Sequence, residues 1–192
     1  MDTSSHASLV AKWTESLKPA EVRLRLATES DSEFIFQLRN DPELAKHLSP
    51  TKPDLGGQRQ WMRDYALRHQ SGKENYFVIE HGAVSVGTIR MYDYEDPAGV
   101  FTWGSWIIKR HTPPHCALRS VLLLYDLGFR ELGFHEARFD VRKENASVLL
   151  FHRRLGAVEK RQSDRDVHFS LTKSDYDLQA RNRLLQLHDK VS

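Results

Sequence analysis

The chain has 192 residues, of which 40% are hydrophobic and 28% are charged. This length and composition indicate one globular domain whose core is large enough to fold alone. Lys and Arg total 28 and Asp and Glu total 26, which gives a net charge of +2. Because this charge is so evenly balanced, it argues against nucleic acid or an anionic membrane as a partner.

Cys116 is the sole cysteine, so the chain cannot form an internal disulfide, and this fits a reducing compartment. The first residues lack the basic start and apolar run of a secretory signal. No segment approaches the roughly 20 apolar residues that a membrane-spanning helix needs. We therefore expect a cytoplasmic protein that has no membrane partner.

The first half of the chain predicts helices and one early strand. Residues 5–17 have the pattern of a short amphipathic helix, and residues 21–26 alternate strictly between apolar and charged side chains, as in a half-buried strand. Ser30 and Glu33 have capping-box spacing, which predicts a helix that begins there and ends before Pro42. The remaining two segments of this half are a loop rich in proline and glycine at 43–57 and a second helix at 58–70.

The second half alternates between strands and helices. A hairpin is predicted at 76–92, and a long strand follows at 100–108, where Gly104 marks a bulge. A loop with two prolines then leads into the clearest helix, whose apolar residues recur at steps of three and four as far as Leu132. The elements that follow are a strand at 137–141, a helix at 146–155, a strand hairpin at 157–161 and 167–171, and a polar helix at 174–191. This order predicts a mixed α/β sheet with helices on both faces.

Three short segments stand in an order, and on element types, that are typical of one family. They are Leu38-Arg-Asn-Asp-Pro42, Leu124-Tyr-Asp-Leu-Gly-Phe-Arg-Glu-Leu-Gly133, and Val141-Arg-Lys-Glu-Asn145 with the later Leu155-Gly156-Ala157. Together they resemble the GNAT acetyltransferase superfamily, and the first is similar to its ribosomal-protein and amino-sugar branch. The resemblance implies a single α/β domain with a mixed, mostly antiparallel central sheet flanked by helices. In that fold, splayed strands form the acetyl-CoA cleft. We expect residues 1–20 to be an N-terminal extension, residues 21–172 the GNAT-like domain, and residues 173–192 an appended helix.

The loop before the long helix departs from the family pattern. The family cradles the CoA pyrophosphate with Q/R-x-x-G-x-G/A, and the matching stretch here is Thr112-Pro-Pro-His-Cys-Ala117, in which only Ala117 fits. The cradle works through backbone N–H groups at a helix N-terminus, and a proline removes a donor only at its own position. A positive φ at His115 would cost on the order of 1 kcal/mol.

Two interpretations of this loop stay open: it binds the pyrophosphate, or its prolines merely begin a helix. The resemblance favours binding. The residues that it implies for acetyl-CoA are Ile107, Ile108, Lys109, Thr112, His115, Cys116, Ala117, Leu118, Arg119, Asn145 and Phe151.

Acetyl transfer from a thioester to an amine needs a neutral amine, a donor for the oxyanion and an acid for the departing thiolate. The family often supplies the acid as a tyrosine seven residues after the asparagine, and this chain has His152 there. His152 shares a helix face with Val148 and Leu155, so it is predicted to point inward, and a pKa near 7 would suit a donor. The alternative is a core histidine without a catalytic role. Cys116, at a helix N-terminus that lowers a thiol pKa, is a weaker candidate nucleophile. No metal ligand is predicted.

The acceptor pocket that the resemblance implies has five candidate residues: Arg39, Trp61, Tyr92, Tyr94 and Trp103. The alternative for most of them is ordinary core. The predicted function is an acetyl-CoA-dependent N-acetyltransferase whose acceptor, a small-molecule amine, is a nucleotide-linked amino sugar for surface polysaccharide. Two alternatives remain: acetylation of a protein N-terminus, and a GNAT-shaped domain that binds CoA or a metabolite without turnover. We expect a monomer or a homodimer.

Overall fold

The computed structural model describes residues 3–17, 21–48, 54–95 and 98–191, without the side chains of residues 3–5. The chain divides into two compact units, and each is described by itself. Unit 1 comprises Met1–Tyr92 and Ser105–Thr112, and unit 2 comprises Asp93–Gly104 and Pro113–Ser192. No described helix has both the length and the apolar character needed to cross a membrane.

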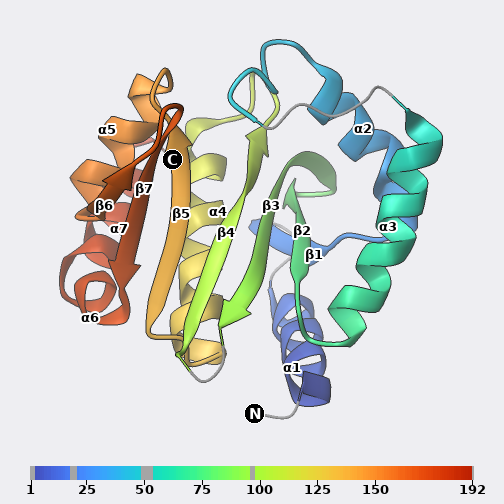
Figure 1. Ribbon diagram of the computed structural model, residues 1–192, viewed down its shortest axis with the longest axis horizontal. Helices are drawn as coiled ribbons and strands as arrows, with labels where there is room; N and C mark the ends of the chain where they lie inside the picture. Colours follow the sequence, from blue (N-terminus) through green and yellow to red (C-terminus); the bar gives the residue numbers. More distant parts are fainter. Residues whose placement is uncertain (1–2, 18–20, 49–53, 96–97, 192) are drawn as a thin grey trace. The chain divides into compact units, whose positions relative to one another are not determined.

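Unit 1 is built on an antiparallel set of strands with helices beside it (Figure 1). Its strands β1 and β2 pair with register Leu24 to Ile79, and β2 pairs in turn with β3. Strand β3 ends in unit 2, and strand β4 begins in unit 2 and ends in unit 1. In chain order the elements are α1 (Thr3–Ser16), β1 (Val22–Leu26), η1 (Glu29–Asp31), α2 (Ser32–Asn40), α3 (Leu55–Gln70), β2 (Asn75–His81), β3 (Val84–Glu95) and β4 (Val100–Ile108).

Two predicted helix starts in unit 1 are wrong, and both for reasons of local capping. The capping box is formed by Thr28 and Asp31, not by Ser30 and Glu33, and it opens the short helix η1 ahead of α2. Helix α3 begins at Leu55, so the predicted loop at 43–57 is shorter than expected; its residues 49–53 lie outside the described part of the chain. The Asp54 carboxylate accepts the Gly56 N–H at 2.9 Å, which satisfies a donor of the first turn.

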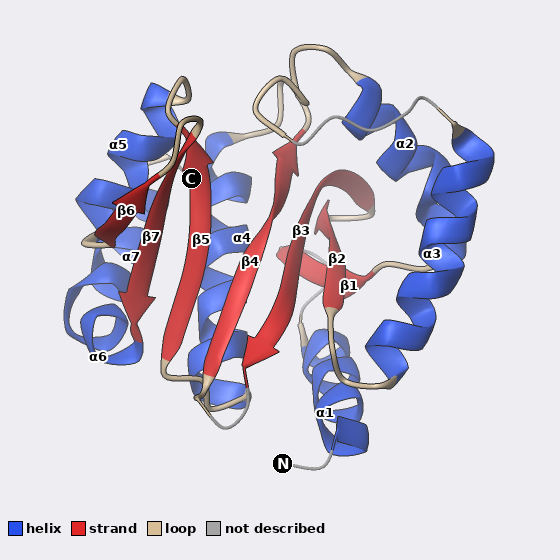
Figure 2. Ribbon diagram, in the orientation of Figure 1, coloured by secondary structure: helices blue, strands red, loops and turns tan. Residues whose placement is uncertain are grey.

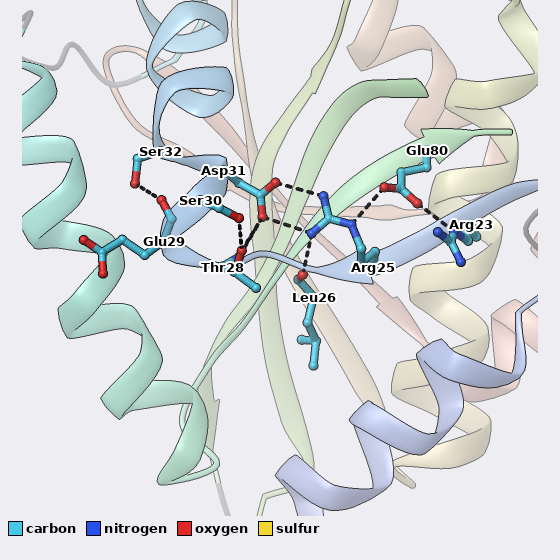
Figure 3. A network of polar contacts seen from close by, with 9 residues as sticks. All are labelled: Arg23, Arg25, Leu26, Thr28, Glu29, Ser30, Asp31, Ser32 and Glu80. Carbon is cyan, nitrogen blue, oxygen red and sulfur yellow. Dashed lines mark hydrogen bonds and ion pairs between the residues drawn. The ribbon is translucent and has the colours of Figure 1, made fainter. Parts of the chain in front are cut away.

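A polar network fastens the start of α2 to strand β1 (Figure 3). The Arg25 guanidinium donates to both oxygens of Asp31, at 2.8 and 3.0 Å, and to Glu80 at 2.8 Å. Glu80 also accepts from Arg23 at 2.7 Å. Burial alone would raise the pKa of Asp31, but the hydrogen bonds from Arg25 and Thr28 hold that pKa below its ordinary value. The network therefore fixes charged groups where β1 leads into the helix.

Unit 2 combines strands with the long central helix. Strand β4 pairs in parallel with β5 through residues 100–102, whereas β5 continues to Arg142. Strand β7 pairs antiparallel with β5 and with β6. In chain order the elements are α4 (Pro114–Asp126), the π-turn η2 (Leu127–Glu131), β5 (Glu136–Arg142), α5 (Ala146–Leu155), β6 (Val158–Gln162), β7 (Asp166–Thr172), α6 (Lys173–Asp175), the π-turn η3 (Tyr176–Ala180) and α7 (Arg181–Asp189).

The described strands follow one another in the sheet order β1-β2-β3-β4-β5-β7-β6. This confirms the predicted mixed, mostly antiparallel sheet in an α/β domain, because β4 and β5 pair in parallel whereas β1 with β2, β2 with β3, β5 with β7 and β6 with β7 pair antiparallel. Figure 2 shows α4 behind strand β5, and α7 packs against α4. The apolar face of α4 is buried, as its spacing predicted.

The end of the described chain closes the core of unit 2. Tyr176 and Leu184 are fully buried, and the Tyr176 hydroxyl donates to Asp126 of α4 at 2.9 Å. The same carboxylate accepts from Arg181 at 3.1 Å. The segment that the sequence suggested as an appended helix therefore supplies part of this core.

Candidate functional site

The end of strand β4 and the loop behind it are fixed within unit 1. The Lys109 N–H donates to the Val86 carbonyl at 2.8 Å, and the Lys109 ammonium lies 5.6 Å from the Phe34 ring centroid. Arg110 forms an ion pair with Asp41 at 3.0 Å. Ile107 is buried, while Ile108 and Thr112 are half-buried. This predicted cofactor strand is therefore held by α2 and by β3.

A strained backbone position lies within β4. The sequence predicted a bulge at Gly104, and the structure places a positive φ of 50° at the next residue, Ser105. Thr88, which is fully buried, donates its hydroxyl to the Ser105 carbonyl at 3.1 Å. A Cβ on Gly87 would lie 2.2 Å from the Ile107 carbonyl oxygen, so only glycine fits there. Strain of this kind costs about 1–3 kcal/mol and persists where surrounding contacts impose it.

The altered loop enters α4 without the strain that the sequence analysis considered at His115. His115 lies in the first helical turn, and the positive φ of this segment, 61°, belongs to His111. Pro114 takes the first helical position, where its fixed φ suits a helix. This turn also offers fewer backbone N–H groups to a pyrophosphate than predicted, because the Cys116 N–H donates to the Pro113 carbonyl at 3.0 Å.

The side chains of this first turn point in different directions. The His115 ring lies edge-on to His188 of α7, with 5.8 Å between the ring centroids. Ala117, Leu118 and Arg119 are half-buried. Cys116 is buried, and burial raises the pKa of its thiol. The expected lowering of that pKa is therefore wrong, and the thiolate needed for a nucleophile is disfavoured.

His152 points inward, as predicted, and is 1% exposed. Its ring is surrounded by aromatic neighbours of unit 2, with centroid distances of 4.3 Å to Phe139, 5.6 Å to Trp103 and 4.9 Å to Phe151. Desolvation by this burial lowers the pKa of His152 to about 3. The expected pKa near 7 is therefore wrong, because this burial depends on aromatic residues of other elements and cannot be read from the face of one helix. At neutral pH the imidazole is uncharged.

Asn145 is the N-cap of α5. Its side-chain oxygen accepts from the Val148 N–H at 3.4 Å and from the Ser147 hydroxyl at 3.2 Å. The helix ends at Gly156, whose φ of 94° is the left-handed conformation typical of a glycine helix cap. Asn145 thus has a local structural role, and its predicted cofactor contact remains a prediction.

The five acceptor candidates fall into both units. Arg39, Trp61 and Tyr92 belong to unit 1, and all three are half-buried. Tyr94 and Trp103 belong to unit 2. Tyr94 packs on Phe134 at 5.2 Å, and Trp103, only 3% exposed, packs on Tyr125 and Phe139 at 5.7 and 5.0 Å.

In unit 1 the structure adds a cationic group that the sequence did not single out. Arg90 lies over the Trp61 ring at 5.3 Å and over the Tyr92 ring at 4.4 Å. Arg68 also contacts the Trp61 ring, at 5.0 Å. Both arginines pair with Glu74 at 2.8 Å, and this carboxylate is almost completely buried. In the sequence Arg90 stands between apolar residues of β3. This pattern predicts a strand, but it does not predict that Arg90 pairs with Glu74.

The sequence and the fold of this chain are both similar to those of known proteins. The chain matches the family model of the GNAT acetyltransferase domain over residues 21–158. It is similar to the solved structure of apo FdhC, a nucleotide-linked sugar GNAT, with 34% sequence identity, a TM-score of 0.77, and coverage of 90% of this chain and 96% of that chain. No curated protein matches.

Two further structures share the fold. RimJ of Mycobacterium smegmatis, in complex with CoA-disulfide, is 17% identical with a TM-score of 0.73, covering 88% of this chain and 90% of that chain. Spermidine N-acetyltransferase from Vibrio cholerae, in complex with CoA and spermine, is 19% identical with a TM-score of 0.69, covering 81% and 98%. The family match over most of the chain and the 34% identity together decide the assignment: the chain belongs to the GNAT acetyltransferases, acyltransferases that use acetyl-CoA.

Proposed function

We propose that this protein transfers the acetyl group of acetyl-CoA to the primary amine of a nucleotide-linked amino sugar. The observation that carries the proposal is the 34% identity, over 90% of the chain, with a nucleotide-linked sugar GNAT. No observation of comparable weight favours acetylation of a protein N-terminus. Membership of an acetyltransferase family also favours turnover over a domain that only binds.

The proposed reaction is direct. The neutral amine nitrogen attacks the thioester carbonyl carbon, so that a C–N bond forms and the C–S bond breaks. The amine proton leaves to a base or to water, and the CoA thiolate takes up a proton. With a pKa of about 3, His152 is neutral at pH 7. In this proposal it donates a hydrogen bond from its ring N–H to the departing sulfur, and no imidazolium takes part.

The residues proposed to hold acetyl-CoA are the backbone of 107–109 and the first turn of α4. The positive end of the α4 dipole favours an anion there even though two prolines replace donors. The engaged N–H groups of Lys109 and Cys116 leave fewer donors than a glycine loop offers. We therefore expect acetyl-CoA to bind more weakly than it does to a GNAT that has the glycine loop.

The acceptor end is proposed to use Trp61, Tyr92 and Arg90 of unit 1. An aromatic ring provides a surface on which a nucleotide base can stack, and a guanidinium provides hydrogen-bond donors for the base or the sugar. Glu74 holds Arg90 in place through a 2.8 Å contact. Arg39, Tyr94 and Trp103 remain candidates by resemblance alone.

The proposal is tested in two steps. Heat unfolding is first followed with and without acetyl-CoA, and we expect the midpoint to rise because ligand binds the folded state. Release of the CoA thiol is then measured with a panel of amino-sugar nucleotides, spermidine and N-terminal peptides. We expect release with an amino-sugar nucleotide. Release with peptides alone would overturn the acceptor, and the lack of any midpoint shift at millimolar acetyl-CoA would overturn the enzyme.

The role of His152 has its own test. Single-turnover acetyl transfer is compared between the wild type and His152→Phe, which keeps an aromatic ring without a donor. We expect a slower chemical step with little change in acetyl-CoA affinity. An unchanged rate would remove His152 from the mechanism.

A further inference from the structure

A polar hollow of about 540 Å³ lies on one face of the strands of unit 2. Along β5, Ala137, Phe139 and Val141 are buried, while Arg138 and Asp140 are exposed on the opposite face. The hollow therefore opens on the exposed face of β5, and two residues of its lining, Phe139 and Phe169, also contact the His152 ring. Its lining residues are Thr102, Glu136, Arg138, Phe139, Asp140, Lys160, Arg161, His168 and Phe169. Its volume falls in the range of small-molecule sites, about 300–1,000 Å³.

A bulge in strand β6 brings two cations to this hollow. The pairing register shifts between Glu159, opposite Phe169, and Arg161, opposite His168, so Lys160 is the extra residue. Neighbouring side chains of a regular strand point to opposite faces. A bulge interrupts that alternation and redirects a side chain. Both Lys160 and Arg161 can therefore line the same hollow.

The side chains of Lys160 and Arg161 are available to bind a ligand. Lys160 and Arg161 are exposed, and neither has an ion pair or hydrogen bond with any residue that the structure describes. Strand β6 is the last strand in the sheet order, so their side chains stand at the edge. Placing two like charges side by side is unfavourable unless an anion or solvent compensates them. The β6 side of the hollow is thus suited to an anion.

Among the other polar residues that line the hollow, Arg138 is paired with carboxylates and Asp140 is not paired with a described cation. The Arg138 guanidinium donates to Glu95 at 3.0 and 3.1 Å and to Glu136 at 3.2 Å, so its charge is offset. Asp140 lies opposite His168 in the β5–β7 pairing and has no ion pair with a described residue. Together with Thr102, its carboxylate provides acceptors for hydroxyl groups. The hollow therefore has two cations that pair with no described residue, Lys160 and Arg161, and the acceptor oxygens of Asp140 and Thr102.

We propose that this hollow binds the phosphate-bearing part of a phosphorylated sugar. Lys160 and Arg161 contact the phosphate, and Asp140 and Thr102 contact the sugar hydroxyls. The inference deepens the proposed function and rests on it, because the proposed acceptor is a sugar that carries phosphate.

Binding is measured by calorimetry on the full chain, with saturating CoA present so that the cofactor site cannot take up the probes. The probes are inorganic pyrophosphate and glucose 1-phosphate. We expect Lys160→Gln and Arg161→Gln each to weaken both probes about tenfold, the effect of losing one charge-assisted contact. Asp140→Asn should weaken glucose 1-phosphate and leave pyrophosphate unchanged or tighter.

Matched controls are Lys190→Gln and Arg165→Gln, two exposed cations outside the hollow, and they should bind like the wild type. If the wild type binds the probes and both Lys160→Gln and Arg161→Gln bind them equally well, the proposal is overturned. It is also overturned if the CoA-saturated wild type binds neither probe. Thiol release from acetyl-CoA with the amine panel is a separate readout. If release occurs without probe binding, only this inference fails; if probe binding occurs without release, only the proposed function fails.

Discussion

Lowering the pH from 7 to 5 should destabilise the protein through His152, and the size of the effect follows from its burial. The ordinary pKa of 6.5 applies to the unfolded chain, and desolvation lowers the folded value to about 3. Between these values the unfolded chain binds a proton that the folded chain does not. Stability from this group is therefore complete above about pH 6.5 and is lost as the pH falls. The linkage amounts to about 2 kcal/mol between pH 7 and pH 5.

The assay is urea unfolding of the wild type and of His152→Phe and His152→Gln at both pH values. Every other titrating group is shared, so the difference between pH slopes isolates His152. We expect the wild type to lose about 2 kcal/mol more than either variant, which in heat unfolding corresponds to a midpoint lowered by about 4–8 °C more. Equal slopes for all three proteins would refute the reasoning, because they would mean that His152 titrates alike in the folded and unfolded chains.

Three further substitutions test, by urea unfolding, how much the contacts around the candidate site stabilise the fold. Asp31→Asn should cost about 2 kcal/mol, since Arg25 loses a charged partner; the lowered pKa of Asp31 also means that its contribution disappears as the pH falls below the ordinary range. Gly87→Ala should cost about 1–3 kcal/mol, because its Cβ would lie 2.2 Å from the Ile107 carbonyl oxygen. Glu74→Gln should cost about 3 kcal/mol, because it leaves two arginines without their shared carboxylate.

Matched substitutions at less constrained positions serve as controls for these three. They are Asp164→Asn in the β6–β7 turn, Ser85→Ala on the same strand as Gly87, and Glu33→Gln on the exposed side of α2. Each control should change the unfolding free energy by no more than about 0.5 kcal/mol. If a test variant falls within that range of its control, the contacts described for it do not stabilise the fold.

The sequence predicted best what depends on local pattern. Strand β4 and helix α5 have the predicted bounds, because a long apolar run and a helix between an asparagine and a glycine are complete within themselves. The start of α3 was missed, since two glycines outweighed the Asp54 cap. The π-turn η2 inside the long apolar helix gave no signal in its spacing.

The site was less predictable than the fold, because its chemistry depends on residues far apart in the chain. Inward orientation of His152 followed from its helix face, but its pKa is set by Trp103 and Phe139, which lie on two other strands. Glu74 and Arg90 likewise meet only after β2 and β3 pair. The Lys160 bulge is a register effect, and a register exists only once strands are paired.

The buried Tyr176 and Leu184 have a consequence for the order of events during synthesis. These side chains complete a core whose other parts, α4 among them, are translated earlier. Until the segment through Leu184 has left the ribosome, Asp126 has neither its Tyr176 nor its Arg181 partner, and the side of α4 that packs on α7 stays uncovered. We expect unit 2 to reach its native packing late, so a released chain truncated after Thr172 should bind chaperones that recognise exposed apolar helices.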